Sequence, residues 1–209
     1  MESLSLRERK QQRARQRIVD AAWALFAERG FVAVSVADIA ERAEVGRTTF
    51  FRYFGDKQEV LFADEEVLLA AIRAAPREQE TATEVPDAIW QLWKIAESIG
   101  GLMFGDPALW ALRSRLLADN PELRDRAARK LDRIADALTD VLCDCGTDPD
   151  VARTAAEVGV GCFRAAQLIA GENPAGVMPA MREAVTRVLA SRFHEVGSPS
   201  VDQKHEGCP

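Results

Sequence analysis

Four Asx-Pro dipeptides divide the second half of the chain into segments of helical length. An Asp or Asn side chain accepts hydrogen bonds from the free backbone amides at a helix start, and proline suits the first helical position. The segments lack the alternation of apolar and polar residues typical of strands. The pattern therefore predicts an all-α chain, with helices at residues 107–118, 121–144, 149–170 and 176–195. The dipeptides are Asp106-Pro107, Asn120-Pro121, Asp148-Pro149 and Asn173-Pro174.

Five further helices are predicted before residue 105. The first carries apolar side chains one helical turn apart, and Gly30 ends it. The fourth begins after Asp56, which forms a second capping signature with Glu59. Together with the later helices they bring the expected total to about nine. The five ranges are residues 8–29, 36–43, 47–53, 57–74 and 86–104.

The second and third predicted helices are short and are joined by a turn that contains glycine. Ser35 and Asp38 form a capping box at the start of the second helix. A seven-residue helix is not stable alone. Phe50 and Phe54 lie one turn apart, however, and can dock the third helix on the two before it. Two short helices joined in this way are typical of a helix-turn-helix.

The start of the third predicted helix carries side chains that can read DNA. Arg47 can bind guanine O6 and N7, and Thr48 and Thr49 offer hydroxyl and methyl groups to base edges. Residues 1–57 hold 11 Lys and Arg against 8 Asp and Glu, a net charge of +3. Residues 58–209 hold 16 against 25, a net charge of −9. A basic head on an acidic body favours DNA binding by the head alone.

Residues 34–61 read VSVADIAERAEVGRTTFFRYFGDKQEVL and closely resemble the DNA-binding signature of the TetR/AcrR transcriptional repressors. The preceding stretch ALFAERGF, residues 24–31, fits the end of the family's first helix. The resemblance covers about residues 10–65. Beyond them only the length and the helical pattern match the family.

The resemblance implies two domains. Residues 1–57 would form a three-helix DNA-binding domain with a basic N-terminal arm at residues 1–10, and residues 58–196 a ligand-binding and dimerisation domain. Residues 197–209 are polar and are predicted to be a disordered tail. The basic segment either starts the first helix or lies along the DNA backbone or a minor groove. Its cations are Arg7, Arg9, Lys10, Arg13, Arg15 and Arg17.

The resemblance also implies particular DNA contacts. Ser35, Tyr53 and Lys57 match phosphate contacts of the family, and the start of the third helix matches its base-reading segment. Two positions depart from the family. Gly46 stands where serine is frequent and Phe51 where tyrosine is usual, so two hydroxyl groups are absent. The expected DNA-binding residues are Ser35, Val36, Gly46, Arg47, Thr48, Thr49, Phe51, Arg52, Tyr53 and Lys57.

Large apolar side chains in the body fit either a packed core or the wall of a ligand cavity, which the family typically keeps in this domain. Aromatic groups with a few polar partners are typical of small-molecule pockets. Arg164 interrupts an apolar run, and it faces the pocket, a second subunit or solvent. The expected ligand-binding residues are Trp90, Trp93, Glu97, Met103, Phe104, Trp110, Arg113, Phe163, Arg164 and Gln167.

The last two predicted helices are candidates for a subunit interface. Residues 149–170 are rich in alanine and glycine, which allow close helix packing. The resemblance assigns this helix and residues 176–195 to a homodimer built as a four-helix bundle. Packing within one chain is the alternative. A dimer would hold two recognition helices about 34 Å apart, as a palindromic operator requires.

These features predict a ligand-responsive repressor that binds double-stranded operator DNA as a dimer and is released by an unknown small-molecule effector. The alternative is a helical small-molecule-binding or interaction module without DNA binding. We expect no enzymatic activity, since His194 and His205 are the only histidines and no catalytic motif occurs. We also expect no cofactor and no metal, because the four cysteines lack zinc-ligand spacing. The absence of a signal peptide or a long apolar run predicts a cytoplasmic protein without membrane contact.

Overall fold

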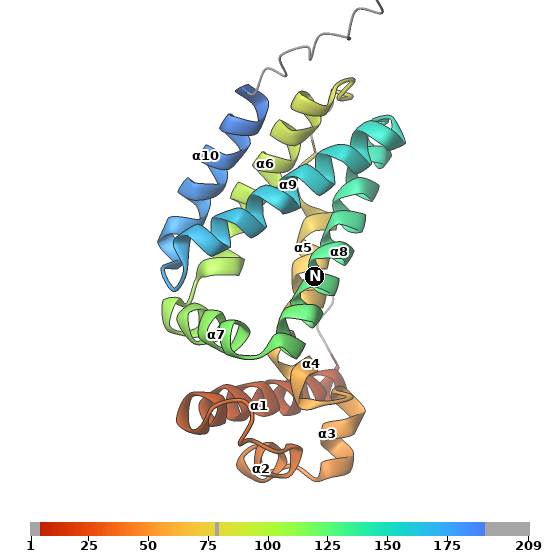
Figure 1. The fold of residues 1–209 in the computed structure, drawn as a ribbon. Coiled ribbons are helices and arrows are strands. Elements are labelled where there is room, and N and C mark those ends of the chain that lie inside the picture. The colour runs from red at the N-terminus through yellow and green to blue at the C-terminus, as the bar shows by residue number, and fades with distance from the viewer. Residues whose placement is uncertain (1–4, 78–79, 191–209) are drawn as a thin grey trace, which may run out of the picture.

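The chain forms a small helical bundle below a larger helical body (Figure 1). The structure is a computed structural model that describes residues 5–77 and 80–190. Within those residues every regular element is a helix, which confirms the predicted all-α fold. The elements are α1 (Leu6–Arg29), α2 (Val36–Arg42), α3 (Arg47–Tyr53), α4 (Lys57–Leu61), α5 (Glu65–Ala74), α6 (Val85–Phe104), α7 (Pro107–Asp119), α8 (Pro121–Asp144), α9 (Pro149–Ala170), the 3-10 helix η1 (Pro174–Gly176) and α10 (Val177–Ala190).

Helices α1, α2 and α3 share one apolar core. Ile18 and Phe26 of α1, Ile39 of α2 and Phe50 of α3 are at most 1% exposed. The Phe50 and Phe54 rings lie 5.9 Å apart between centroids, and both are buried. The predicted docking of the short third helix through this pair is confirmed.

The turns of the bundle follow the sequence signals closely. Ser35 Oγ accepts a hydrogen bond from the Asp38 amide at 3.2 Å, and Asp38 Oδ2 accepts one from the Ser35 amide at 2.8 Å. This reciprocal pair is the predicted capping box. Gly30 follows α1 with φ +75°, a conformation that glycine adopts without steric cost. Glu44 makes the turn before α3 with φ +53°, which is uncommon for a residue with a side chain.

The predicted single helix at residues 57–74 is wrong in one respect, because it is divided into α4 and α5. The Ala63 carbonyl lies in the break and accepts a hydrogen bond from Arg15 of α1 at 2.6 Å. The Asp64 carboxylate turns to Lys130 of α8, at 2.9 Å. Phe62 is buried in the N-terminal core. Contacts with distant helices thus replace the helical ladder here and raise the helix count by one.

Three of the four Asx-Pro pairs cap a helix as predicted. The side chains of Asp106, Asp148 and Asn173 accept backbone amide hydrogen bonds, although Asn173 caps η1 rather than α10 directly. Asn120 differs because α7 and α8 meet at this residue without a loop. Its side-chain amide donates to the Leu116 carbonyl at 2.7 Å and so closes α7 instead of capping α8.

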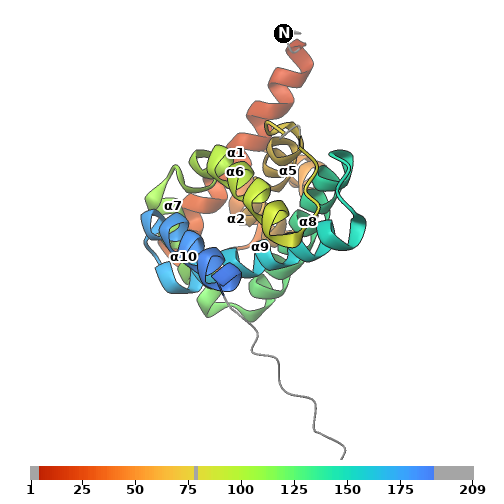
Figure 2. The ribbon, with the colours of Figure 1, turned by 90° about the horizontal axis from the view of Figure 1, so that it is seen from above.

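The basic N-terminal segment is helical from Leu6 onward, which supports the first of the two alternatives for it. Ser5 and Glu8 form a capping box at this start. Figure 2 shows the first turns of α1 projecting beyond the rest of the chain. Residues 1–4 lie outside the described residues, as does the predicted tail at residues 197–209.

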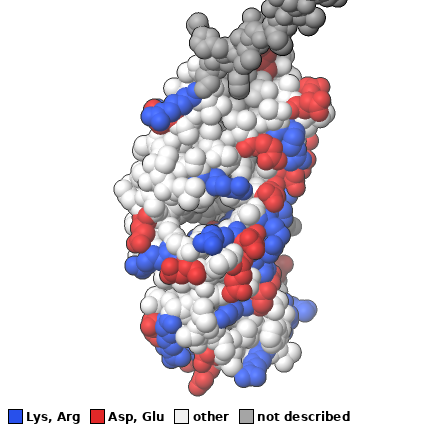
Figure 3. Space-filling view, viewed as in Figure 1, with Lys and Arg blue, Asp and Glu red and all other residues white. Residues whose placement is uncertain are grey.

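A second apolar core fills the body between α5, α6, α8, α9 and α10. Helix α9 packs against α6, α8 and α10, and Ala152, Ala155 and Ala156 are fully buried on it. Part of the small-residue stretch therefore serves packing within the chain. The opposite side of α9 carries Leu168 and Ile169, which are 81% and 73% exposed. Figure 3 shows few charged side chains over α9 and α10, whereas charges crowd the edge along α8.

The two cores meet near the joint between bundle and body. Leu116 of α7 and Leu123 of α8 pack in the N-terminal core together with Phe62. Packing thus crosses the domain boundary that we predict after residue 57, and the boundary stays a prediction. None of the helices in the described part of the chain is long and apolar enough to cross a bilayer.

Replacing Phe50 with alanine should lower the free energy of unfolding by about 3–5 kcal/mol, because it leaves a cavity in a closed core. Urea denaturation followed by circular dichroism measures the change. Phe51→Ala is the matched control on the same helix, since Phe51 is 56% exposed. We expect that control to cost less than about 1 kcal/mol. Equal losses in the two variants would contradict the packing described here.

Candidate nucleic-acid interface and ligand cavity

Helix α3 presents one face to solvent and buries the other. Arg47, Thr48 and Arg52 are exposed, while Phe50 is fully buried on the opposite side. Gly46 precedes the helix without a side-chain cap, so the first amides of α3 are open. Among the remaining predicted DNA-binding residues, Ser35 and Phe51 are exposed, whereas Val36, Thr49, Tyr53 and Lys57 are partly buried. The structure therefore brings the predicted residues together on one end of the bundle.

Ser35 is already engaged within its own helix start. Its hydroxyl and its amide both donate to the Asp38 carboxylate. These hydrogen bonds hold the pKa of Asp38 below its usual value. A charged carboxylate thus lies beside the predicted phosphate contact, with Arg29 at 3.8 Å as its counter-charge.

Cations from α1 gather beside the end of α3. Arg7 and Lys10 of α1 line an open hollow together with Arg52 and Tyr53 of α3. The Arg52 guanidinium lies over the Tyr53 ring, 5.1 Å from its centroid. Because the first turns of α1 are exposed, this hollow joins the basic segment to the helix-turn-helix. The hollow is therefore lined by cations of both α1 and α3.

Lys57 has a set of partners that the sequence did not predict. Its ammonium donates to the carbonyl oxygens of Phe31 at 2.7 Å and Val34 at 2.8 Å. The same group lies 4.3 Å from the centroid of the Phe31 ring. Burial lowers the pKa of Lys57. The lysine therefore ties the loop between α1 and α2 to the start of α4.

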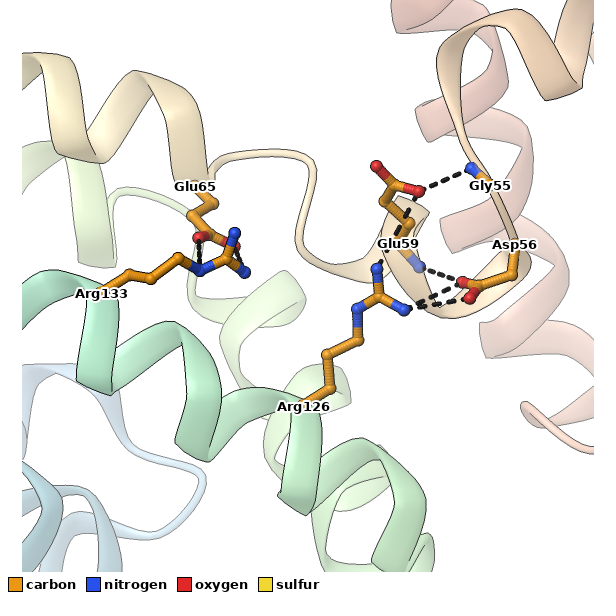
Figure 4. Close-up of polar contacts among 6 residues, drawn as sticks. All are labelled: Gly55, Asp56, Glu59, Glu65, Arg126 and Arg133. Atoms are coloured by element: carbon orange, nitrogen blue, oxygen red, sulfur yellow. Dashed lines mark hydrogen bonds and ion pairs between the residues drawn. The ribbon is translucent and has the colours of Figure 1, made fainter.

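Arginines of α8 connect the body to α4 and α5 (Figure 4). Arg126 binds the Asp56 carboxylate at 3.0 Å and lies 3.9 Å from Glu59. Asp56 also caps α4 as predicted, whereas the Glu59 carboxylate accepts from the amide of Gly55 instead of Asp56. One helix of the body thus holds the cap of α4, which follows α3 in the chain.

An apolar cavity of about 60 Å³ lies between α5, α6, α8, α9 and α10. Four of the predicted ligand-binding residues line it, namely Trp93, Met103, Phe104 and Phe163. The sequence pattern thus identified aromatic wall residues on α6 and α9. Their packing leaves this apolar space open.

A second cavity, of about 70 Å³, adjoins the first and has a polar side. Its polar lining consists of Asp64, Arg113, Lys130 and Gln167. Arg113 and Gln167 were predicted, and so was Trp110, which lines the same space. The Trp110 indole donates to the Gly171 carbonyl at 3.1 Å, which fixes the ring.

Three predicted ligand-binding residues lie outside both cavities, and these assignments need correction. Trp90 is 42% exposed on the outer side of α6. Glu97 pairs with Arg182 of α10 at 3.0 Å on the surface. Arg164 is exposed on α9, so it does not face the pocket. The apolar run around Arg164 reflects packing on the other side of the helix.

Sequence reasoning missed Lys130 and Asp64. Lys130 is 5% exposed and interrupts the buried face of α8 between Leu123 and Ile134. The position of Lys130 on this face was the signal that could have identified it, because a lysine among buried apolar residues needs an anionic partner. Asp64 gave no such signal, since its role depends on the break between α4 and α5.

Comparison with known proteins gives consistent matches. Residues 18–63 match the family model described as bacterial regulatory proteins, tetR family. The chain is 30% identical over 142 residues to the HTH-type transcriptional regulator TcmR of Streptomyces glaucescens, covering 66% of this chain and 62% of TcmR. It is 30% identical over 89 residues to the HTH-type transcriptional regulator HbdR of an Aromatoleum species, covering 40% of this chain and 39% of HbdR.

The fold has solved counterparts as well. The structure of Thermus thermophilus FadR, a TetR-family transcriptional repressor, superposes with a TM-score of 0.56 at 21% identity, covering 88% of this chain and 99% of FadR. The fold and the exposed short helix define a helix-turn-helix protein. Residues 18–63 of this chain are similar to the tetR family of bacterial regulatory proteins, and a longer stretch is similar to TcmR. The chain spans about three fifths of the length of TcmR and two fifths of HbdR.

Replacing Lys57 with methionine should lower the free energy of unfolding by about 1–3 kcal/mol, because two backbone carbonyls lose a charged donor. Chemical denaturation measures this loss, and Lys10→Met on the exposed side of α1 is the control. An unchanged stability, together with uniformly weaker DNA binding and a salt slope lower by about one, would leave only a phosphate-contact role for Lys57.

Proposed function

We propose that this chain is a ligand-responsive transcriptional repressor that binds a palindromic operator as a homodimer and is released by a small-molecule effector. The observation that carries the proposal is the orientation of α3. Arg47 and Thr48 stand exposed at its start while Phe50 fixes its other side in the core. The match of residues 18–63 to the tetR family model and the names of the curated relatives support the same role.

In this proposal Arg47, Thr48 and Thr49 contact base edges in the major groove. Ser35, Arg52 and Tyr53 contact phosphates, and the cations of α1 beside them extend this backbone contact. Lys57 supports the interface chiefly by holding the loop between α1 and α2. A phosphate contact by Lys57 would use the same ammonium group. Because Gly46 and Phe51 lack a hydroxyl group, we expect the contacts to the DNA backbone to rely more on Arg52 and the arginines of α1.

We propose that two copies associate through α9 and α10. The exposed Leu168 and Ile169 of α9 and Val188 of α10 support this assignment. Figure 3 shows few charged side chains over these two helices. Gly161 is exposed on the same side of α9, and a side chain added there would meet nothing within 4 Å in its own subunit. A second helix could therefore approach α9 closely at this point.

We propose that the effector occupies the cavities of the body. The Thermus thermophilus FadR structure is a complex with lauroyl-CoA, so a protein of this fold binds a small molecule. In this chain the contacts of α8 with α4 and α5 offer a route from the cavity to the recognition helix. A ligand weakens operator binding only by its differential affinity for the two states.

Neither catalysis nor a cofactor is part of the proposal, because the relatives are named as regulators. No group of His, Cys, Asp and Glu within residues 5–77 and 80–190 could hold a metal ion. A cytoplasmic location follows from the proposed role, since the protein must reach operator DNA. We retain the division into residues 1–57 and 58–196 as the working description of the two domains.

Arg47→Ala should cost about 1–3 kcal/mol of operator affinity and relax specificity at one base position. Genomic fragments captured by the pure protein supply the operator, and fluorescence anisotropy gives the dissociation constant. Arg73→Ala removes an exposed arginine of α5, away from α3, and should leave binding unchanged. An operator bound equally well by Arg47→Ala would contradict the proposed orientation, and a failure to retain any DNA would contradict the function.

Leu168→Glu should shift the protein from dimer to monomer in sedimentation experiments, because it puts a charge in an apolar interface. Operator affinity should fall with it, since two linked recognition helices bind together more tightly than one. Val32→Glu is the control for the sedimentation measurement alone, as Val32 is 80% exposed in the loop between α1 and α2. A stable dimer of Leu168→Glu would locate the interface elsewhere.

A further inference from the structure

The two cavities of the body lie next to each other and differ in polarity. The same four side chains line both cavities, namely Leu68, Met103, Ile134 and Phe163. The first cavity is apolar throughout, while the second carries Asp64, Arg113, Lys130 and Gln167. A molecule that fills both therefore meets an apolar wall at one end and cations at the other.

Lys130 is the most constrained group at the polar end. Its side chain is only 7% exposed, and its ammonium binds Asp64 Oδ1 at 2.9 Å. Arg113 holds the other oxygen of the same carboxylate at 3.3 Å, and its side chain is 22% exposed. A buried ammonium needs an anion, because transfer from water to a protein interior penalises an unpaired charge. Burial and the nearby Arg113 accordingly lower the pKa of Lys130.

The Asp64 carboxylate, in contrast, can move away from the two cations. Its side chain is 55% exposed and also lines the open groove between α1 and α7. Beside this carboxylate, Glu65 pairs with Arg133 at 2.8 Å and also favours the charged form of Lys130, whereas Asp64 lies within 3.3 Å of both Arg113 and Lys130. An incoming anion could take its place while Asp64 turns to solvent. Such an exchange leaves Lys130 paired throughout.

The walls permit a ligand larger than the present space. Met103, Met178 and Met181 line the apolar end. Methionine side chains are unbranched and adapt to irregular shapes, which is why they recur at adaptable binding surfaces. Met103 also lines the open groove, together with Asp64 and Arg113. The groove thus leads from solvent to the polar end of the cavity.

Resting on the proposed function, we propose that the effector is an amphipathic anion. Its apolar part fills the space beside Trp93 and Phe163, and its anionic group replaces Asp64 on Lys130 and Arg113. Asp64 begins α5 directly after the break that joins the body to α4. The displaced carboxylate therefore removes one tie between α8 and the segment that follows the recognition helix.

The test compares straight-chain carboxylates with primary alcohols of the same length, hexanoate to decanoate against 1-hexanol to 1-decanol. Calorimetric titration of the full chain measures both dissociation constants. We expect the acid to bind at least about tenfold more tightly than its alcohol, because only the acid pairs with the buried cations. Equal binding of acid and alcohol, or no binding of any acid, overturns the proposal.

Two variants act in opposite directions. Lys130→Met should abolish the preference for the acid and leave the alcohol unaffected. Asp64→Asn should bind the acid several-fold more tightly, because no carboxylate competes for the cations. A general loss of stability cannot produce that gain, so this variant decides the matter even if Lys130→Met folds poorly. Arg129→Met, an exposed position on the same helix, should match the wild-type chain. Unchanged acid binding by Asp64→Asn contradicts the exchange.

Operator binding is measured in the same preparations without any probe. Retention of operator DNA with no preference for acids leaves the proposed function intact and removes the amphipathic anion. Absence of DNA binding with a clear preference for acids contradicts the proposed function and leaves the proposed ligand class intact. The two proposals therefore fail separately.

Discussion

The structure depends on the burial of two phenylalanines of α3. A seven-residue helix loses more in conformational entropy than its few hydrogen bonds return, so it does not persist in water. Phe50 and Phe54 place two aromatic rings in the core formed by α1 and α2, and this burial supplies the missing stabilisation. The exposed side chains of α3 are then not needed to hold the helix in place. Arg47 and Thr48 can project toward a groove because the opposite face is fixed.

The same bundle is tied to the body by the apolar contacts of Leu116 and Leu123 and by polar contacts on α4 and on the break that follows it. Arg126 holds the cap of α4, Lys130 holds Asp64, and Arg15 of α1 holds the Ala63 carbonyl. The α4–α5 segment is therefore clamped from above by α8 and from below by α1. A movement of α8 relative to α1 must change some of these contacts. This geometry makes the break between α4 and α5 the natural place for a ligand to affect the bundle.

Much of this arrangement follows from local sequence signals. The Ser35 box, Gly30 and the spacing of Phe50 and Phe54 specify the bundle because each acts within one helical turn or its cap. The division between α4 and α5 escaped prediction because its causes lie far away in the sequence, on α1 and α8. Asn120 failed as a cap for a similar reason, since the end of α7 already uses its side chain.

The site residues follow the same rule. Trp93 and Phe163 were predictable as buried because they are large aromatic groups on the apolar side of a helix. They line the apolar cavity. Which polar groups reach the cavity was less predictable. Arg164 seemed a candidate from its apolar neighbours, yet the helical turn directs it outward. Lys130 reaches the cavity because it lies on the buried face of α8, and Asp64 meets it only through tertiary folding.

The pairing of Lys130 and Asp64 therefore combines two properties that are usually separate. The cation is fixed and cannot reach water, whereas the carboxylate has an exposed side and can be exchanged. A buried pair of two fixed charges would be a structural tie, and an exposed pair would contribute little. A pair with one exchangeable partner is a tie that a competing anion can open. Asp64 lies directly before α5, so this pair stands on the chain segment between the cavity and α3.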